Sequence, residues 1–240
     1  MKTRLDRLLV ERGLAESREK AQALIMAGAV LAGGQKASKP GQPVVPGVAL
    51  EVLARPPYVG RGGFKLAAAL RHFGIDVTGK VCLDIGSSTG GFTDALLQAG
   101  AARVHAVDVG AGQLDWKLRT DARVVPHEGV NARRLRFENI GELVDLIACD
   151  VSFISVTLIL PAAAPLLHPD GKMVILVKPQ FEAGKGQVGK GGIVRDPAIH
   201  RAACERVEGA VRERGFETGM IESPILGAEG NKEFLLYAHH

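Results

Sequence analysis

The chain has 240 residues, of which 46% are hydrophobic, 23% charged and 5% aromatic, a balance typical of a globular protein long enough to bury its own core. Its three cysteines form no CxxC pair, which argues against a disulfide framework and a zinc site, and its charged first residues are not followed by the apolar segment of a signal peptide. The most apolar stretch, residues 156–167, is about half as long as the ~20 residues of a membrane span, so we expect a cytoplasmic protein rather than a secreted or membrane-spanning one.

Positive charge is concentrated at the start of the chain. Residues 1–60 contain nine Lys and Arg against five Asp and Glu, whereas residues 61–240 contain 21 of each kind. A basic module beside a neutral one is typical of a protein that binds a nucleic acid electrostatically. An ordinary solvated surface would account for the same excess, so charge alone leaves both interpretations open.

The first quarter of the chain has the pattern of a small α+β domain. Residues 4–12 have the apolar spacing of a short amphipathic helix that Gly13 ends, and Ser17 is placed to cap a second helix through Ala27. Short β-like segments separated by Gly and Pro turns follow as far as residue 53. The polar faces of the two helices carry five basic side chains: Arg4, Arg7, Arg12, Arg18 and Lys20.

This layout resembles the S4-like RNA-binding domain. The segments that carry the resemblance are Arg4-Leu5-Asp6, Ser17-Arg18, Lys20-Ala21, Gly28-Ala29-Val30, Gly34 and Lys39-Pro40-Gly41. The chain departs from the family at Ala32-Gly33, where Val-Asn is usual before the turn glycine. The resemblance implies an RNA-binding domain over residues 1–54, with Arg4, Arg7, Arg18 and Lys20 as contacts, followed by a stiff linker over residues 55–60.

Residues 61–240 alternate apolar runs with helical stretches. Strands are predicted at 81–85, 103–107, 123–125, 143–149 and 172–177, helices at 91–100 and 198–215, and two final strands near 217–222 and 234–238. This βαβ alternation predicts an α/β domain with a mostly parallel, doubly wound sheet. Ligands of such sheets bind at the carboxyl ends of the strands.

The loop after the first of these strands has the pattern acidic-x-Gly-x-x-x-Gly. A dinucleotide fingerprint would require a second glycine where Ser88 stands, so binding of a nicotinamide cofactor is disfavoured. The loop resembles the S-adenosylmethionine loop of Rossmann-like methyltransferases, although a purely structural turn is the alternative. The resemblance implies a cofactor site built from Asp84, which suits the positive charge of the ligand, from Gly86, Ser87, Ser88, Thr89 and Gly90, from Asp108 at the ribose and from Asn131 at the adenine.

Two other patterns suggest functions that the residues do not support. Residues 184–190 almost form a P-loop, but Gly191 replaces the Ser or Thr that binds Mg²⁺. We interpret residues 183–193 either as a loop that contacts RNA phosphate through Lys185 or Lys190, or as a solvated glycine-rich loop. Cysteines within apolar strands behave as small hydrophobes, and the histidines have no metal-ligand spacing, so no metal is expected.

Four charged residues lie where a small or apolar residue would be the structural default. Lys65 opens the helix before the first strand of the large domain, Asp150 and Lys178 end two of its strands, and Glu233 begins the last one. Each alone would be interpreted as a surface charge. Together, at strand ends that meet along one edge of a sheet, they indicate a catalytic site.

These four residues match the Lys-Asp-Lys-Glu tetrad of FtsJ-like RNA ribose 2′-O-methyltransferases, and the two joined domains resemble the TlyA (hemolysin A) family over nearly the whole chain. Further matching segments are Arg61-Gly62-Gly63, residues 84–93, 149–155 and 178–182, Gly189 to Pro197, and Gly230 to Glu233. The chain departs at Gly60, where Ser is usual, and it lacks the interdomain Arg-x-Trp-Val form.

The resemblance implies methylation of a cytidine ribose in ribosomal RNA, and the short termini resemble the class that acts on the large subunit. Lys178 would be the general base, Asp150 would orient its amine, Lys65 would stabilise charge or position a phosphate, and Glu233 would complete the network. The alternatives are an RNA-binding ribosome assembly factor with an inert fold and, from the family's name, a cytolysin. The sequence leaves the oligomeric state open, and a monomer is compatible with it.

Overall fold

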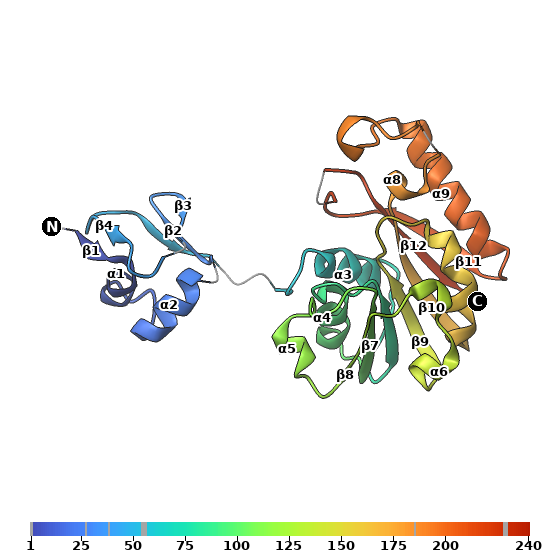
Figure 1. The fold of residues 1–240 in the computed structure, drawn as a ribbon, viewed down its shortest axis with the longest axis horizontal. Coiled ribbons are helices and arrows are strands. Elements are labelled where there is room, and N and C mark those ends of the chain that lie inside the picture. Colours follow the sequence, from blue (N-terminus) through green and yellow to red (C-terminus); the bar gives the residue numbers. More distant parts are fainter. Residues whose placement is uncertain (1, 27, 38, 54–56, 185, 228–229) are drawn as a thin grey trace. The chain divides into compact units, whose positions relative to one another are not determined.

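The computed structural model describes residues 2–26, 28–37, 39–53, 57–184, 186–227 and 230–240. The chain forms two compact units, Met1–Pro57 and Tyr58–His240, each of which is considered by itself (Figure 1). The division falls inside the segment expected to be a linker, of which residues 55 and 56 lie outside the described part.

The first unit packs two helices against short strands. The helices are α1 (Leu5–Glu11) and α2 (Arg18–Met26), and the strands are β1 (Thr3–Arg4), β2 (Val30–Ala32), β3 (Gln35–Lys36), β4 (Pro43–Val44) and β5 (Leu50–Val52). β1 pairs with β4, and β2 lies between β3 and β5 in a three-stranded antiparallel sheet. Gly13 follows α1 with a φ of +68°, and the Ser17 hydroxyl accepts from the Lys20 amide at 3.2 Å. Ala27, the expected end of the second helix, is outside the described residues.

A buried carboxylate joins the two helices of this unit. Asp6 on α1 is fully buried, and it accepts hydrogen bonds from Arg4 at 2.8 and 3.0 Å, from Arg18 at 3.0 Å and from Gln22 at 2.9 Å. The hydrogen bond from Arg4, followed by those from Gln22 and Arg18, holds the pKa of Asp6 far below its ordinary value against the opposing effect of burial. Arg4 and Arg18 therefore neutralise a buried charge inside the domain.

The second unit is built on a seven-stranded sheet. Its strands are β6 (Val81–Ile85), β7 (Arg103–Asp108), β8 (Val124–Glu128), β9 (Val144–Cys149), β10 (Leu167–Val177), β11 (Glu217–Glu222) and β12 (Phe234–His239). Its α-helices are α3 (Gly62–His72), α4 (Gly91–Gln98), α5 (Trp116–Arg119), α6 (Phe137–Ile140), α7 (Leu160–Ala163), α8 (Pro179–Glu182) and α9 (Pro197–Arg212). Short 3₁₀ helices are η1 (Ala132–Arg134), η2 (Val156–Leu158), η3 (Ala164–Leu166) and η4 (Lys190–Gly192).

The strand order is β11-β12-β10-β9-β6-β7-β8, and the pairs among β8, β7, β6, β9 and β10 are parallel. The predicted α/β class with a mostly parallel, doubly wound sheet is thus confirmed. β12 runs antiparallel between β10 and β11, with Val177 opposite Phe234. This insertion brings the first residue of β12 to the edge where the parallel strands end, which places Glu233 beside the end of β10.

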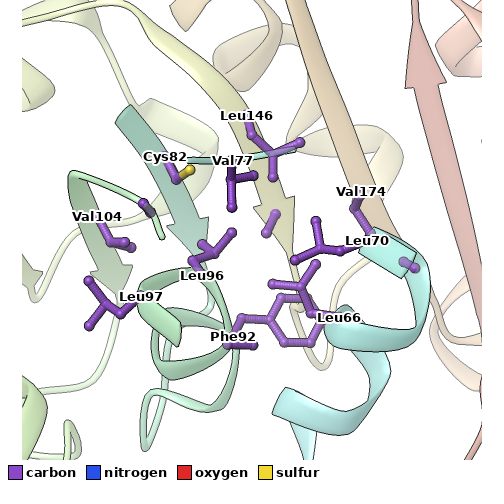
Figure 2. Close-up of a cluster of buried hydrophobic side chains, with 14 of the residues drawn as sticks. Leu66, Leu70, Val77, Cys82, Phe92, Leu96, Leu97, Val104, Leu146 and Val174 are labelled. Atoms are coloured by element: carbon purple, nitrogen blue, oxygen red, sulfur yellow. The ribbon is translucent and has the colours of Figure 1, made fainter. Parts of the chain in front are cut away.

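Two apolar layers cover the faces of the sheet. On one face α3 and α4 pack their Leu66, Leu70, Phe92 and Leu96 side chains over Cys82 and its strand neighbours (Figure 2). On the other face α7 and α9 cover β9, β10 and β12. Cys82 and Cys149 lie within these layers, and burial raises the pKa of the Cys82 thiol to about 12, so neither is a reactive thiolate.

None of the helices in the described part of the chain is long and apolar enough to cross a membrane.

Candidate functional site

A pocket of about 460 Å³ opens where β6, β7 and β9 end. The end of β7 and the segments that follow β6, β7, β8 and β9 form its wall: Gly86, Ser88, Val107, Asp108, Val109, Gln113, Val130, Asn131, Ala132, Arg133, Asp150, Val151, Ser152, Phe153, Ile154 and Ile159. It has the location expected of a ligand site in a doubly wound sheet.

The turn between β6 and α4 requires glycine at two positions, Gly86 and Gly90. Gly86 has a φ of +85°, and a Cβ there would lie 2.2 Å from the carbonyl oxygen of Asp150, so the backbones after β6 and β9 touch. Gly90 has a φ of +96°, and a Cβ there would lie 2.2 Å from the Leu118 Cδ1. Ser88 between them also adopts a left-handed φ of +48°. With no side chain at Gly86, the ends of β6 and β9 lie close together, and residues of the turn line the pocket.

Asp84 lies at the end of β6 beneath this turn. It is fully buried, and its Oδ2 accepts from the Thr93 hydroxyl at 2.6 Å. Burial, together with the nearby charges of Asp150 and Asp108, raises the pKa of Asp84 to about 7 against the opposing hydrogen bonds from Thr93. Its Oδ1 is buried and has no hydrogen-bond partner among the described residues. A buried carboxylate oxygen without a partner is suited to a cationic ligand group.

Two further polar residues line the pocket with fixed orientations. Asp108 at the end of β7 accepts from the Ser88 amide at 2.8 Å and from the Gly110 amide at 2.7 Å. Asn131 caps η1 by accepting from the Arg133 amide at 3.1 Å. Backbone amides thus hold the side-chain oxygens of both residues in place at the pocket wall. Ser87 is buried, and the Thr89 carbonyl accepts from the Asp115 amide at 3.2 Å.

The four charged residues form two ion pairs. Lys178 Nζ lies 2.5 Å from Asp150 Oδ1, and it donates to the Ser152 hydroxyl at 2.9 Å. Lys65 Nζ on α3 donates to Glu233 Oε2 at 2.5 Å, although 168 residues separate the two in the sequence. The first pair borders the pocket through Asp150, and the second is buried, with Lys65 7% and Glu233 3% exposed.

The first turn of α3 lies next to both pairs. A Cβ on Gly62, three residues before Lys65, would lie 3.7 Å from Asp150 Oδ2. The predicted contact of Lys178 with Asp150 is present in the structure, whereas the charge of Lys65 is shared with Glu233 in the interior. The four residues are therefore arranged as an accessible pair supported by a buried one.

Two residues of the segment after β9, Ser152 and Phe153, were not predicted from the sequence as site residues. Ser152 is the second oxygen partner of the Lys178 amine. Phe153 is 90% exposed in a left-handed backbone conformation with φ +64°, which is rare for a bulky residue, and its ring lies 5.2 Å from that of Phe181. Their only sequence signal was membership of the segment 149–155, because neither exposure nor φ can be deduced from residue type.

The basic residues expected to contact RNA have different surroundings. Arg7 is exposed, while Lys20 is paired with Glu16 and Arg12 donates to the carbonyls of Pro46 and Val48. Lys185 and the side chain of Lys190 lie outside the described residues. Within the described ranges, no three His, Cys, Asp or Glu side chains are arranged so that they could hold a metal ion.

Comparison with protein families matches both units. Residues 58–240 match the FtsJ-like methyltransferase family, and residues 3–50 match the S4 domain. The methyltransferase match spans the pocket and both ion pairs.

Full-length relatives share this organisation. The chain is 49% identical to "Putative rRNA methyltransferase YqxC" of Bacillus subtilis, over 99% of this chain and 86% of that protein. It is 48% identical to the 16S/23S rRNA (cytidine-2′-O)-methyltransferase TlyA of Mycobacterium tuberculosis, over 98% of this chain and 89% of that protein. A solved structure, "Putative hemolysin from Streptococcus thermophilus", superposes with a TM-score of 0.76 at 45% identity, over 99% of this chain and 88% of that one.

Proposed function

Because the chain belongs to the FtsJ-like methyltransferase family, we propose that it transfers the methyl group of S-adenosylmethionine to the 2′-hydroxyl of a cytidine ribose in ribosomal RNA. The observation that carries this proposal is the Lys178–Asp150 pair beside a pocket at the carboxyl ends of β6, β7 and β9. A lysine amine held by a carboxylate at that edge is suited to removing a proton from a ligand hydroxyl.

The proposed cofactor fits the residues of the pocket. S-adenosylmethionine, when bound, supplies a methyl group on a positively charged sulfur. The free Oδ1 of Asp84 and the raised pKa of this carboxyl, about 7, are explained by a site built for a cationic group. Gly86 and Gly90 allow backbone contact, Asp108 offers carboxylate oxygens to ribose hydroxyls, and Asn131 offers an amide to the adenine edge.

The proposed reacting group is a ribose hydroxyl, which is a weak acid and must lose its proton to react. Lys178, in its neutral form, accepts the hydroxyl proton as the oxygen attacks, and Asp150 holds the amine in place. Lys65 and Glu233 support this arrangement from the interior and carry charge near the reacting oxygen. General-base assistance contributes about 10²- to 10⁴-fold, so alignment of the two substrates supplies much of the remainder.

The first unit supplies RNA affinity in this proposal. We assign residues 1–54 to RNA binding and residues 61–240 to catalysis, in keeping with the S4 match and the excess of positive charge before residue 61. The substrate is a ribosomal subunit or its RNA, most simply the large subunit, and the site of action is the cytoplasm.

The experiment that tests the proposal maps ribose methylation. The full-length protein is incubated with ribosomal subunits and labelled S-adenosylmethionine, and modified positions are located by mass spectrometry. One specific 2′-O-methylcytidine is expected. RNA binding without methyl transfer would instead identify a non-catalytic assembly factor, and lysis of cells by the purified protein without RNA modification would support the cytolysin alternative.

Two substitutions at Lys178 test the base directly. Lys178→Arg keeps the positive charge but cannot lose its proton at working pH, and Lys178→Met keeps the stem without the amine. Both should bind cofactor and RNA normally and lose about 100-fold or more in turnover. The rate of the natural protein should rise with pH, because a general base acts in its deprotonated form. A near-normal rate in Lys178→Arg with this rise intact would exclude Lys178 as the base.

A further inference from the structure

Ser152 is a neighbour of the proposed base to which the proposed function gives no role. Its hydroxyl oxygen lies 2.9 Å from Lys178 Nζ, on the same short segment that carries Asp150. The side chain is exposed and lines the pocket. Because Ser152 lines the pocket and is hydrogen-bonded to Lys178, it can influence the amine. Because it is exposed, a substitution there should not disturb the packing of the fold.

The valence of a neutral amine explains why a hydroxyl acceptor matters. A neutral lysine amine has two N–H groups and one lone pair, and the group rotates about its Cε–Nζ bond unless an N–H group is held. Ser152 Oγ accepts one N–H at 2.9 Å, while Asp150 Oδ1 lies 2.5 Å from the nitrogen in an ion pair without hydrogen-bond geometry. The hydrogen bond to Ser152 therefore restricts the direction of the lone pair.

Lys65 provides a comparison within the same site. Among the described residues, the contact recorded for its Nζ is the single pair with Glu233. The hydrogen bond of Lys65 goes to its carboxylate partner, whereas that of Lys178 goes to a neutral hydroxyl beside the carboxylate of its ion pair. The hydroxyl acceptor is thus found at the lysine that must direct a lone pair rather than a charge.

The backbone holds this arrangement. Asp150 is tied to β6 by its amide, which donates to the Ile85 carbonyl at 2.9 Å. Phe153, directly after Ser152, adopts the left-handed φ of +64°, a strained conformation that persists when the surroundings enforce it. The segment from Asp150 to Phe153 therefore has a defined shape that places two oxygens on one amine.

We propose that Ser152 is a positioning residue for methyl transfer, which acts by accepting a hydrogen bond from Lys178 so that the neutral amine directs its lone pair at the ribose hydroxyl. This inference rests on the proposed function, because it requires Lys178 to be the base. It assigns the orientation of the base to Asp150 and Ser152 together rather than to the carboxylate alone.

The test uses a matched pair of substitutions in the full-length protein. Ser152→Thr retains the hydroxyl, and Ser152→Val has nearly the same shape without it. Ser152→Val and Ser152→Ala should lower kcat about tenfold, the loss expected for one hydrogen bond to a group of this kind, while KM for S-adenosylmethionine and for RNA changes less than twofold. Ser152→Thr should retain at least half of the kcat. The rise of the rate with pH should persist in every variant, because the base is still present.

A double substitution separates action through Lys178 from a direct contact with substrate. In a Lys178→Met background, adding Ser152→Ala should change the residual rate less than twofold, since there is no amine left to orient. A normal kcat in Ser152→Ala, equal losses in the Thr and Val variants, or a full tenfold penalty in the Lys178→Met background would each overturn the inference. If Lys178→Met itself were fully active, the proposed function would fail instead, so the two failures are distinguishable.

Discussion

At the scale of single residues, the pocket depends on a glycine whose missing side chain is needed for two strand ends to touch. Gly86→Ala would place a Cβ 2.2 Å from the Asp150 carbonyl oxygen and would add the strain of a φ of +85°. We expect calorimetry to show S-adenosylmethionine binding weakened at least tenfold, because the segment carrying Asp150 must move.

Gly129→Ala is the matched control for this prediction. Gly129 has a similar φ of +70°, but a Cβ there would have no atom within 4 Å. This variant should lose about 1 kcal/mol of stability through backbone strain and keep its cofactor affinity. Equal affinities in the two variants would show that contact between the strand ends does not shape the site.

Because Asp84 is buried, we expect the free energy of unfolding of the protein to depend on pH. Its pKa in the folded protein is about 7, against an ordinary value of 3.8, because burial disfavours the carboxylate. A raised pKa means that the folded state binds the extra proton, so the contribution of Asp84 to stability is complete below about pH 4 and is lost as the pH rises through 7.

The measurement compares Asp84→Asn with the natural protein in urea unfolding at pH 5 and pH 8. The natural protein should lose stability relative to the variant between these values, by an amount on the order of 2 to 3 kcal/mol. The variant should also bind S-adenosylmethionine more weakly, because it lacks the carboxylate that we propose for the cationic ligand group. A stability difference that is independent of pH would contradict the assignment of a buried, titrating carboxyl.

At the scale of elements, α1 and α2 are joined by Asp6. Asp6→Asn removes the charge that Arg4 and Arg18 neutralise, and leaves two guanidinium groups without a counter-ion. We expect amide hydrogen exchange in residues 5–26 to become about 10- to 100-fold faster, while exchange in β6, β9 and β10 is unchanged. Glu16→Gln, which breaks the exposed pair with Lys20, is the control and should have little effect. Unchanged protection in Asp6→Asn would show that apolar packing alone holds the helices.

The contacts of α1 and α2 also change which basic residues of this unit we expect to bind RNA. Arg4 and Arg18 were expected among the RNA contacts, but each has a structural partner in Asp6, and Lys20 has one in Glu16. Lys2, Arg7, Lys36 and Lys39 are exposed, and the described residues form no side-chain hydrogen bond or ion pair with them. These four basic side chains can therefore bind a phosphate without breaking an existing contact.

At the scale of the whole molecule, the uneven distribution of charge predicts that the first unit provides RNA affinity and the second binds the cofactor. Residues 1–60 hold the entire excess of positive charge. A chain that begins at residue 58 should bind ribosomal RNA more weakly, and its affinity should depend less steeply on salt because fewer counter-ions are released. S-adenosylmethionine affinity should be retained, since every residue of the pocket lies after residue 58. Binding of RNA by the shortened chain with an undiminished salt slope would assign RNA recognition to the second unit.

Much of the fold could be predicted because its signals are local. Strands β6, β7 and β9 are mostly apolar and the end of β10 is a continuous apolar run, and the βα alternation implies their parallel pairing. The turn after β6 was recognisable from its glycines, which supply conformations that other residues rarely adopt. The order of the last two strands was not predictable, because nothing in the residues of β11 and β12 specifies which one pairs with β10.

The sequence by itself thus determined the class of sheet, the turn that approaches the ligand and the candidates Lys65, Asp150, Lys178 and Glu233. Only the tertiary structure decided how these charges pair, since Lys65 meets Glu233 across 168 residues and Lys178 meets Ser152 across 26. It also decided that Arg4 and Arg18 pair with the buried Asp6. The physical reason is that strand and turn formation follow from neighbouring residues, whereas the partner of a charge depends on which side chains the packed sheet brings within hydrogen-bond distance.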